Sequence, residues 1–179
     1  MELLVGALGS DRGISRSELD KLILYKGSEA QRNGTNEITA EDVRACIVDS
    51  SQDAAFDVAA VSAGGNPGGL SAVLHRANAA GVAPITILIF LQRHFMRLYS
   101  VQAAVSAGMP PDAAMKRLRP PVFFADQKAF QTQLRKWPLA KLERAMTDLT
   151  EVEHLAKRTG APQRELIERL ALRLAVMAK

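Results

Sequence analysis

Apolar residues in this chain recur at spacings of three and four positions, the pattern of α-helices that bury one face. Alternation of apolar and polar residues, which marks a half-buried strand, is nearly absent. The sequence therefore predicts an all-α protein. The clearest pattern lies in two late stretches, one from Pro138 with Leu139, Leu142, Ala145, Met146, Leu149 and Val152, the next with Leu166, Ile167, Leu170 and Leu174.

Glycine and proline divide the apolar stretches into separate helices. We expect a short helix over residues 54–63, ended by a glycine pair. Asn66 begins the next helix, because its side chain can accept a backbone N–H and Pro67 has the φ angle of a first helical position. That helix stops at Gly81. The longest helix, residues 84–108, is apolar on nearly every face in its first half, so we expect it to be packed on several sides.

The first 50 residues carry shorter helical signals separated by polar stretches. Thr39 with Asp42 resembles a capping box and opens a short helix through Val48. The sequence SSQD at residues 50–53 marks a boundary. We therefore predict two parts, a small helical module over residues 1–50 and a helical bundle over residues 51–179.

Length and composition fit one mid-sized domain with a small module attached, since the chain has 179 residues of which 47% are hydrophobic. Cys46 is the single cysteine and lies in an apolar run, so we interpret it as a small buried side chain in a reducing, cytoplasmic protein. No signal peptide is predicted at the N-terminus. The most apolar run, residues 82–91, is too short to span a bilayer.

Charge is distributed unevenly along the chain. The first 50 residues hold 6 Lys and Arg against 9 Asp and Glu, a balance of −3, and residues 51–115 are balanced. Residues 116–179 hold 14 Lys and Arg against 7 Asp and Glu, a balance of +7. A basic last third indicates either a nucleic-acid partner or a solvated helical surface.

Motifs for catalysis and for metal binding are absent from the sequence. His75, His94 and His154 are far apart, with no HExxH and no paired cysteines, so we expect no metal site and interpret His94 as a polar position of a packed helix. No GxSxG elbow and no paired acid and base are present. We therefore expect no enzymatic activity and no cofactor for this chain alone.

Phosphate binding is suggested by the stretch GSDRGISRSELDKL, residues 9–22, where Arg12 precedes the start of a helix. A nucleotide site also needs a cradle such as GxxxxGK[ST], which the chain lacks. The glycine-rich GGNPGG at residues 64–69 has no lysine and no preceding strand, so it reads as a turn between helices. A cryptic ATP-binding protein that uses Arg12 is thus the weakest of our hypotheses.

Five segments in fixed order give the chain a resemblance to a known family: GSDRGISRSELDKLILY, ITAEDVRACIVDS, PITILIFLQRHFMRLYSVQAAVSAG, LRPPVFFADQKAFQTQLRKW and KLERAMTDLTEVEHLAKRTGAP. Together they resemble the C-terminal part of the delta subunit of the bacterial DNA polymerase III clamp loader, in its alphaproteobacterial form. The resemblance covers essentially the whole chain.

The resemblance implies a domain organisation. The family has a degenerate AAA+ ATPase-like domain that grips and opens the sliding clamp, a small helical lid, and a helical collar that joins the loader subunits in a ring. Residues 1–50 resemble the end of the lid and residues 51–179 the collar. The first domain has no counterpart here, so we expect this chain to be part of a longer, non-ATPase subunit of a DNA polymerase holoenzyme.

The resemblance also implies partners. The collar would bind the gamma/tau and delta-prime subunits, primer–template DNA would be met only within the assembled loader, and the sliding clamp only through the absent first domain. Active loader ATPases carry a GSxR sensor in the lid, which Gly9 to Arg12 match. Arg12 is then either the relic of a sensor or part of the start of a capped helix. We favour the capped helix.

Two further places have alternative interpretations. In some delta relatives an aromatic residue in the turn before the last helix meets the primer end, but Thr159 occupies that place here and has no π face. Lys157 and Arg158 could still contact phosphates or simply stabilise a helix C-terminus. Six apolar residues could form either a subunit interface or part of the intrachain core. They are Pro120, Pro121, Val122, Phe123, Phe124 and Trp137.

The leading hypothesis is therefore a replication scaffold, the collar of a clamp-loader delta subunit. The alternative is a helical DNA-binding protein that uses the basic last third, for which tight duplex binding with a steep salt dependence would be diagnostic.

Overall fold

The computed structural model describes residues 16, 19–20, 22–27, 39 and 50–179, and every regular element in this part of the chain is an α-helix. The predicted all-α fold is confirmed. The chain divides into two compact units, Met1–Ser50 and Ser51–Lys179. In the first unit residues 22–27 are helical, with Leu22 and Lys26 buried. Arg12, Cys46 and the helix expected after Thr39 lie outside the described residues.

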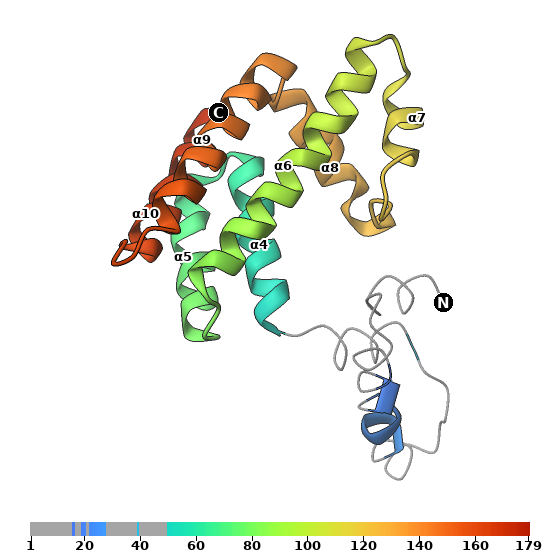
Figure 1. Ribbon diagram of the computed structural model, residues 1–179. Helices are drawn as coiled ribbons and strands as arrows, with labels where there is room; N and C mark the ends of the chain where they lie inside the picture. Colours follow the sequence, from blue (N-terminus) through green and yellow to red (C-terminus); the bar gives the residue numbers. More distant parts are fainter. Residues whose placement is uncertain (1–15, 17–18, 21, 28–38, 40–49) are drawn as a thin grey trace. The chain divides into compact units, whose positions relative to one another are not determined.

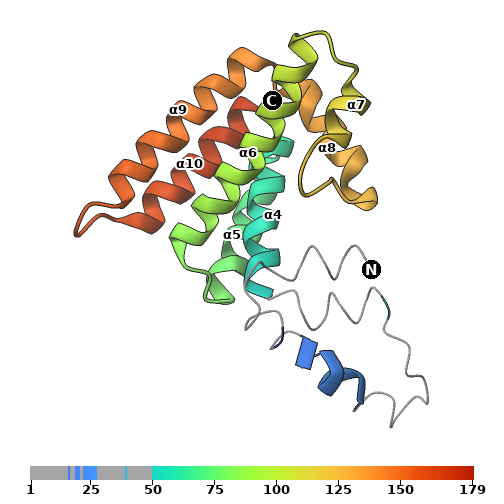
Figure 2. The same ribbon diagram turned by 45° about the vertical axis from the view of Figure 1, so that its right-hand side comes forward.

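The second unit consists of helices joined by short turns (Figure 1). Helices α6 and α9 pack against each other, and α10 packs against both of them and against α5. Helices α7 and α8 lie along α6 on its other side, as the two views in Figures 1 and 2 agree. The helices are α4 (Ser50–Gly64), α5 (Pro67–Ala79), α6 (Pro84–Ser106), α7 (Pro111–Lys116), α8 (Phe124–Lys136), α9 (Leu139–Ala156) and α10 (Gln163–Met177).

The helix starts that the sequence predicts at Asn66 and Pro84 are confirmed. The Asn66 side chain caps α5, because its Oδ1 accepts the Gly69 N–H at 2.9 Å, and Pro67 is the first helical residue. Pro84 opens α6, which at 23 residues is the longest helix described. Gly81, between these two helices, has a φ of 71°. This left-handed conformation ends α5 as expected.

The core of the second unit surrounds α6. Ile87, Leu88, Leu91, Phe95 and Leu98 of this helix are all buried. They meet residues from each helix packed on α6, including Leu142 and Leu149 of α9 and Ile167 and Leu174 of α10. The mostly apolar circumference of α6 is thus explained by burial on several sides.

Two hydrogen bonds in this core connect three helices. His94 of α6 is 6% exposed, and its Nε2 lies 2.8 Å from Oε1 of Gln133 on α8. The Gln133 Nε2 in turn donates to the Ala60 carbonyl of α4 at 3.1 Å. Burial is the main cause that lowers the pKa of His94 from 6.5 to about 4, and the charge of Arg97 acts in the same direction. His94 is therefore a neutral, hydrogen-bonded residue of a packed helix at neutral pH.

Gly65 and Gly81 provide a matched test of the close approach between α4 and the C-terminus, because both have a φ of 71°. A Cβ on Gly65 would lie 2.9 Å from the Ala178 carbonyl oxygen, whereas nothing lies within 4 Å of one on Gly81. We expect Gly81→Ala to lower the free energy of unfolding by about 1 kcal/mol and Gly65→Ala by about 2–4 kcal/mol, since only the latter adds overlap to backbone strain. Urea unfolding followed by circular dichroism measures both. Equal losses would contradict the contact with Ala178.

Candidate interaction surface

The start of α8 and the turn before it carry the most exposed large apolar side chain described in the second unit, that of Phe124. Phe124, the first residue of α8, is 90% exposed, and Phe123 before it is 45% exposed. Pro120 and Pro121 are also exposed, while Val122 is half-buried and packs against the core. We call residues 119–124 the aromatic loop. Neither phenylalanine belongs to the core formed by the described residues, so both are available to a partner.

The aromatic loop is held at three places by hydrogen bonds to its own backbone or that of its neighbours. Arg97 of α6 donates to the Pro120 carbonyl at 3.2 Å, and Gln127 of α8 donates to the Val122 carbonyl at 3.4 Å. Arg119 folds back and donates to the Leu118 carbonyl at 3.0 Å and to that of Lys116 at 3.1 Å. A surface held in one conformation loses little entropy when a partner binds.

Arg97 joins the aromatic loop to the core. Its guanidinium carbon lies 5.8 Å from the centre of the Phe130 ring, a residue that is buried on α8. Partial burial lowers the pKa of Arg97, and the nearby Asp126 carboxylate opposes that effect. The side chain therefore stays charged, as arginine does throughout proteins, and keeps its donors for Pro120.

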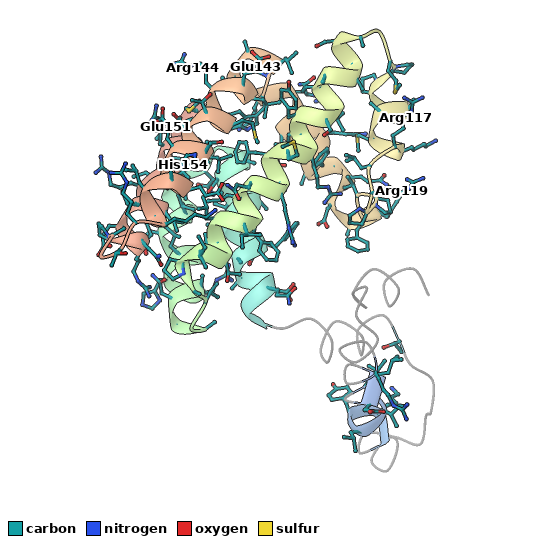
Figure 3. All side chains as sticks on the ribbon, in the orientation of Figure 1. Arg117, Arg119, Glu143, Arg144, Glu151 and His154 are labelled. Atoms are coloured by element: carbon teal, nitrogen blue, oxygen red, sulfur yellow. The ribbon has the colours of Figure 1, made fainter. Side chains whose placement is uncertain are left out.

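Positively charged side chains lie in the aromatic loop and in the segments next to it. Lys116, Arg117, Arg119 and Lys128 are all exposed, and none of them forms an ion pair with a residue that the structure describes. Figure 3 shows Arg117 and Arg119 on the outer side of α7 and the loop. An exposed aromatic pair with arginines beside it has the composition of a protein interface core with a basic rim.

Trp137 does not belong to this surface. The sequence left open whether Trp137 belongs to a subunit interface or to the intrachain core. The structure places it in the core, with an exposure of 0%. The centres of the Trp137 and Phe95 rings lie 4.8 Å apart in an edge-to-face arrangement. The Trp137 Nε1 donates to the Ala63 carbonyl at 2.8 Å. Trp137 is therefore a core residue in this structure, because its whole surface is already covered.

The turn between α9 and α10 holds the residues that the sequence offered as a DNA-facing site. Lys157, Arg158 and Thr159 are all exposed. Lys157 lies 2.5 Å from the Glu153 carboxylate one helical turn earlier, and this hydrogen bond is the first cause that lowers the pKa of Glu153. Part of the basic charge is thus neutralised within α9. Arg158 has no partner among the described side chains and remains the free cation of this turn.

The two candidate places lie far apart in the second unit, as both ribbon views show (Figures 1 and 2). The aromatic loop is beside α6, α7 and α8, whereas the Lys157–Thr159 turn is at the end of the α9–α10 pair. The structure therefore does not combine them into one site. Arg12, the third candidate, lies outside the described residues.

One charged place on α9 and α10 was missed by the sequence analysis. Lys141, Arg144 and Asp148 of α9 line a small cavity together with Arg173 and Met177 of α10. The spacing of the first three residues could have indicated that they share one helical face. No local sequence pattern predicts that Arg173 and Met177 of α10 lie beside them.

No group of three or more His, Cys, Asp or Glu among the described residues has the geometry to hold a metal ion. None of the described helices combines the length and apolar character needed to cross a bilayer.

Comparison of the chain with protein-family models, with curated proteins and with solved structures found no match. By its fold, the second unit is an all-α helical bundle.

Proposed function

We propose that this chain is the C-terminal part of a clamp-loader delta subunit, and that its second unit is a collar that assembles with other subunits during DNA replication. The partners proposed are the gamma/tau and delta-prime subunits. The chain would act as a cytoplasmic scaffold without ATPase activity. The sliding clamp would be bound by a preceding domain, and primer–template DNA would be met only in the assembled loader.

One observation carries the proposal. The aromatic loop belongs to LRPPVFFADQKAFQTQLRKW, one of the five segments on which the resemblance depends, and it carries Phe124, the most exposed large apolar side chain that the structure describes. Hydrogen bonds from Arg97 and Gln127 fix its backbone. A scaffold subunit needs such a surface, because burial of aromatic side chains contributes much of the free energy of association.

Assembly is the direct test. The chain is mixed with the gamma/tau and delta-prime subunits of the same organism and analysed by size-exclusion chromatography with light scattering. We expect a shift into a stoichiometric complex. The same experiment with the complete subunit shows whether the preceding domain is also required. Absence of a complex in both cases would contradict the proposal.

Substitution of Phe124 tests the surface itself. Because Phe124 is 90% exposed, we expect Phe124→Ser to change the free energy of unfolding by less than about 0.5 kcal/mol. Loss of an aromatic anchor should weaken the complex at least about tenfold. Leu172→Ser is the matched control, since Leu172 is 47% exposed on α10 and lies outside the aromatic loop. Equal affinity of the Phe124 variant and the unchanged chain would exclude this loop as the interface.

The alternative function, direct DNA binding, is favoured by Arg158, which has no ion-pair partner among the described residues, and by the balance of +7 in residues 116–179. It predicts tight binding of duplex DNA by the isolated chain, with affinity that falls steeply as salt is added. Fluorescence anisotropy with labelled duplex at several salt concentrations separates the two functions. The scaffold proposal predicts weak binding or none.

A further inference from the structure

A cavity lies between the start of α9 and the end of α10, apart from the aromatic loop. It has a volume of about 200 Å³, opens on the surface, and is lined by Lys141, Arg144, Asp148, Arg173 and Met177. One water molecule occupies roughly 30 Å³ in the liquid, so the cavity has room for a small polyatomic ion. Three cations and one carboxylate give its lining side chains a formal balance of +2.

Antiparallel packing of α9 and α10 brings these residues together. Figures 1 and 2 show the two helices side by side, with the C-terminal residue near the first turns of α9. Lys141 therefore meets Met177, and Asp148 meets Arg173, at separations in sequence that no local motif produces. Figure 3 places Arg144 at this end of α9.

Two of the three cations are held in place by the protein. The Lys141 Nζ donates to the Met177 carbonyl at 2.7 Å and lies 5.9 Å from the centre of the Trp137 ring. Arg173 lies 2.9 Å from Oδ1 of Asp148, a carboxylate whose side chain is only 9% exposed. An ammonium has three N–H donors and a guanidinium has five, so each cation keeps donors for a further acceptor.

Arg144 is the third cation and differs from the other two. It is exposed, and it forms no ion pair with any residue of the described chain. Its charge is not neutralised within the protein, whereas Asp148 neutralises that of Arg173. Apart from the Arg173–Asp148 ion pair, the charged side chains that line the cavity are thus those of Arg144 and Lys141.

The Met177 carbonyl belongs to the C-terminal end of α10, which carries partial negative charge and opposes an anion. The ammonium of Lys141 is bound to this carbonyl and offsets that effect. Asp148 repels an anion as well, but it is buried and its Oδ1 faces Arg173. The positive charges are the more exposed ones, so an approaching ligand meets them first.

We propose that this cavity binds a phosphate dianion, either as the free ion or as the terminal group of a phosphate monoester. Arginine and lysine donors bind phosphoryl oxygens through charge-assisted hydrogen bonds. The formal balance of +2 matches a dianion, whereas a phosphodiester, with its single negative charge, neutralises only half of it. The site does not depend on the clamp-loader proposal, because it uses residues outside the aromatic loop.

The test is a titration of the full chain followed by two-dimensional ¹H–¹⁵N NMR at constant ionic strength and pH 7.5. Inorganic phosphate and methyl phosphate represent the free ion and the monoester, and dimethyl phosphate represents the diester. We expect saturable shifts of the α9 and α10 amides with the first two ligands, and binding of dimethyl phosphate about tenfold weaker. Binding of inorganic phosphate without methyl phosphate would assign the free ion as the ligand, and the reverse would assign the monoester.

Arg144→Gln and Arg164→Gln form a matched pair for this titration. Both arginines are exposed, but Arg164 is in the first turn of α10, at the opposite end of that helix from Met177. We expect Arg144→Gln to weaken phosphate binding about tenfold and Arg164→Gln to leave it unchanged. Equal weakening by both variants, an absence of saturable shifts, or equal binding of dimethyl and methyl phosphate would overturn the proposal. Circular dichroism verifies that both variants are folded.

Discussion

Replacement of Trp137 by alanine is expected to lower the free energy of unfolding by about 3–5 kcal/mol, the range for a large aromatic residue lost from a core. The side chain is fully buried between α4, α6 and α9, with an edge-to-face contact to Phe95 at 4.8 Å. Its Nε1 also donates to the Ala63 carbonyl at 2.8 Å. Truncation would remove this hydrogen bond and leave a cavity in the core.

Trp137→Phe separates packing from hydrogen bonding. Phenylalanine fills most of the space but has no N–H, so we expect a loss of about 1–3 kcal/mol. Phe124→Ala is the aromatic control, because that ring is 90% exposed and its removal should cost less than about 0.5 kcal/mol. Urea unfolding must be followed by far-ultraviolet circular dichroism, since Trp137 is the chain's single tryptophan. A loss below about 1 kcal/mol for Trp137→Ala would contradict its place in the core.

Acidification is expected to destabilise the second unit through His94. The pKa of this side chain is lowered from 6.5 to about 4 in the folded chain. Between these two pH values the unfolded chain binds a proton at His94 that the folded chain does not bind. The free energy of unfolding therefore falls as pH decreases through this window, by about 3 kcal/mol in total, and His94 contributes no pH dependence well above pH 6.5.

His94→Gln isolates this effect. The glutamine amide can still donate to Gln133 but does not titrate. We expect the free energy of unfolding of this variant to fall about 3 kcal/mol less than that of the unchanged chain between pH 6.5 and 4. His75 and His154 are exposed and present in both proteins, so their contributions cancel in the comparison. Parallel pH profiles from urea unfolding would show that His94 is not buried in its neutral form.

Local signals were sufficient for the helices that carry strong start and stop residues. Asn66 and Pro67 predicted the start of α5, and Gly81 its end, because a cap and a φ angle act on the backbone within a few residues. The spacing of Leu142, Ala145 and Leu149 predicted the buried face of α9. The bounds of α7 and α8 were not predicted, since several prolines in this region offered competing signals.

The candidate sites were only partly predictable. The sequence identified Phe123 and Phe124 as candidates for an interface, and their exposure distinguishes them from Trp137, which the same reasoning had grouped with them. The charged cavity was missed, because Arg173 reaches Asp148 only through the packing of α10 on α9. A residue's place on its own helix can be read from spacing, but its neighbour on another helix cannot.

The sequence by itself determined that this protein is helical, where α5 and α6 begin, and which face of α9 is apolar. These properties depend on backbone geometry and side-chain periodicity over a few residues. Only the tertiary structure decided that Trp137 is bound to Ala63, that His94 is neutral and joined to Gln133, and that Lys141 lies against Met177. These contacts join residues 36 or more positions apart, so they form only when all the helices that bury them pack together.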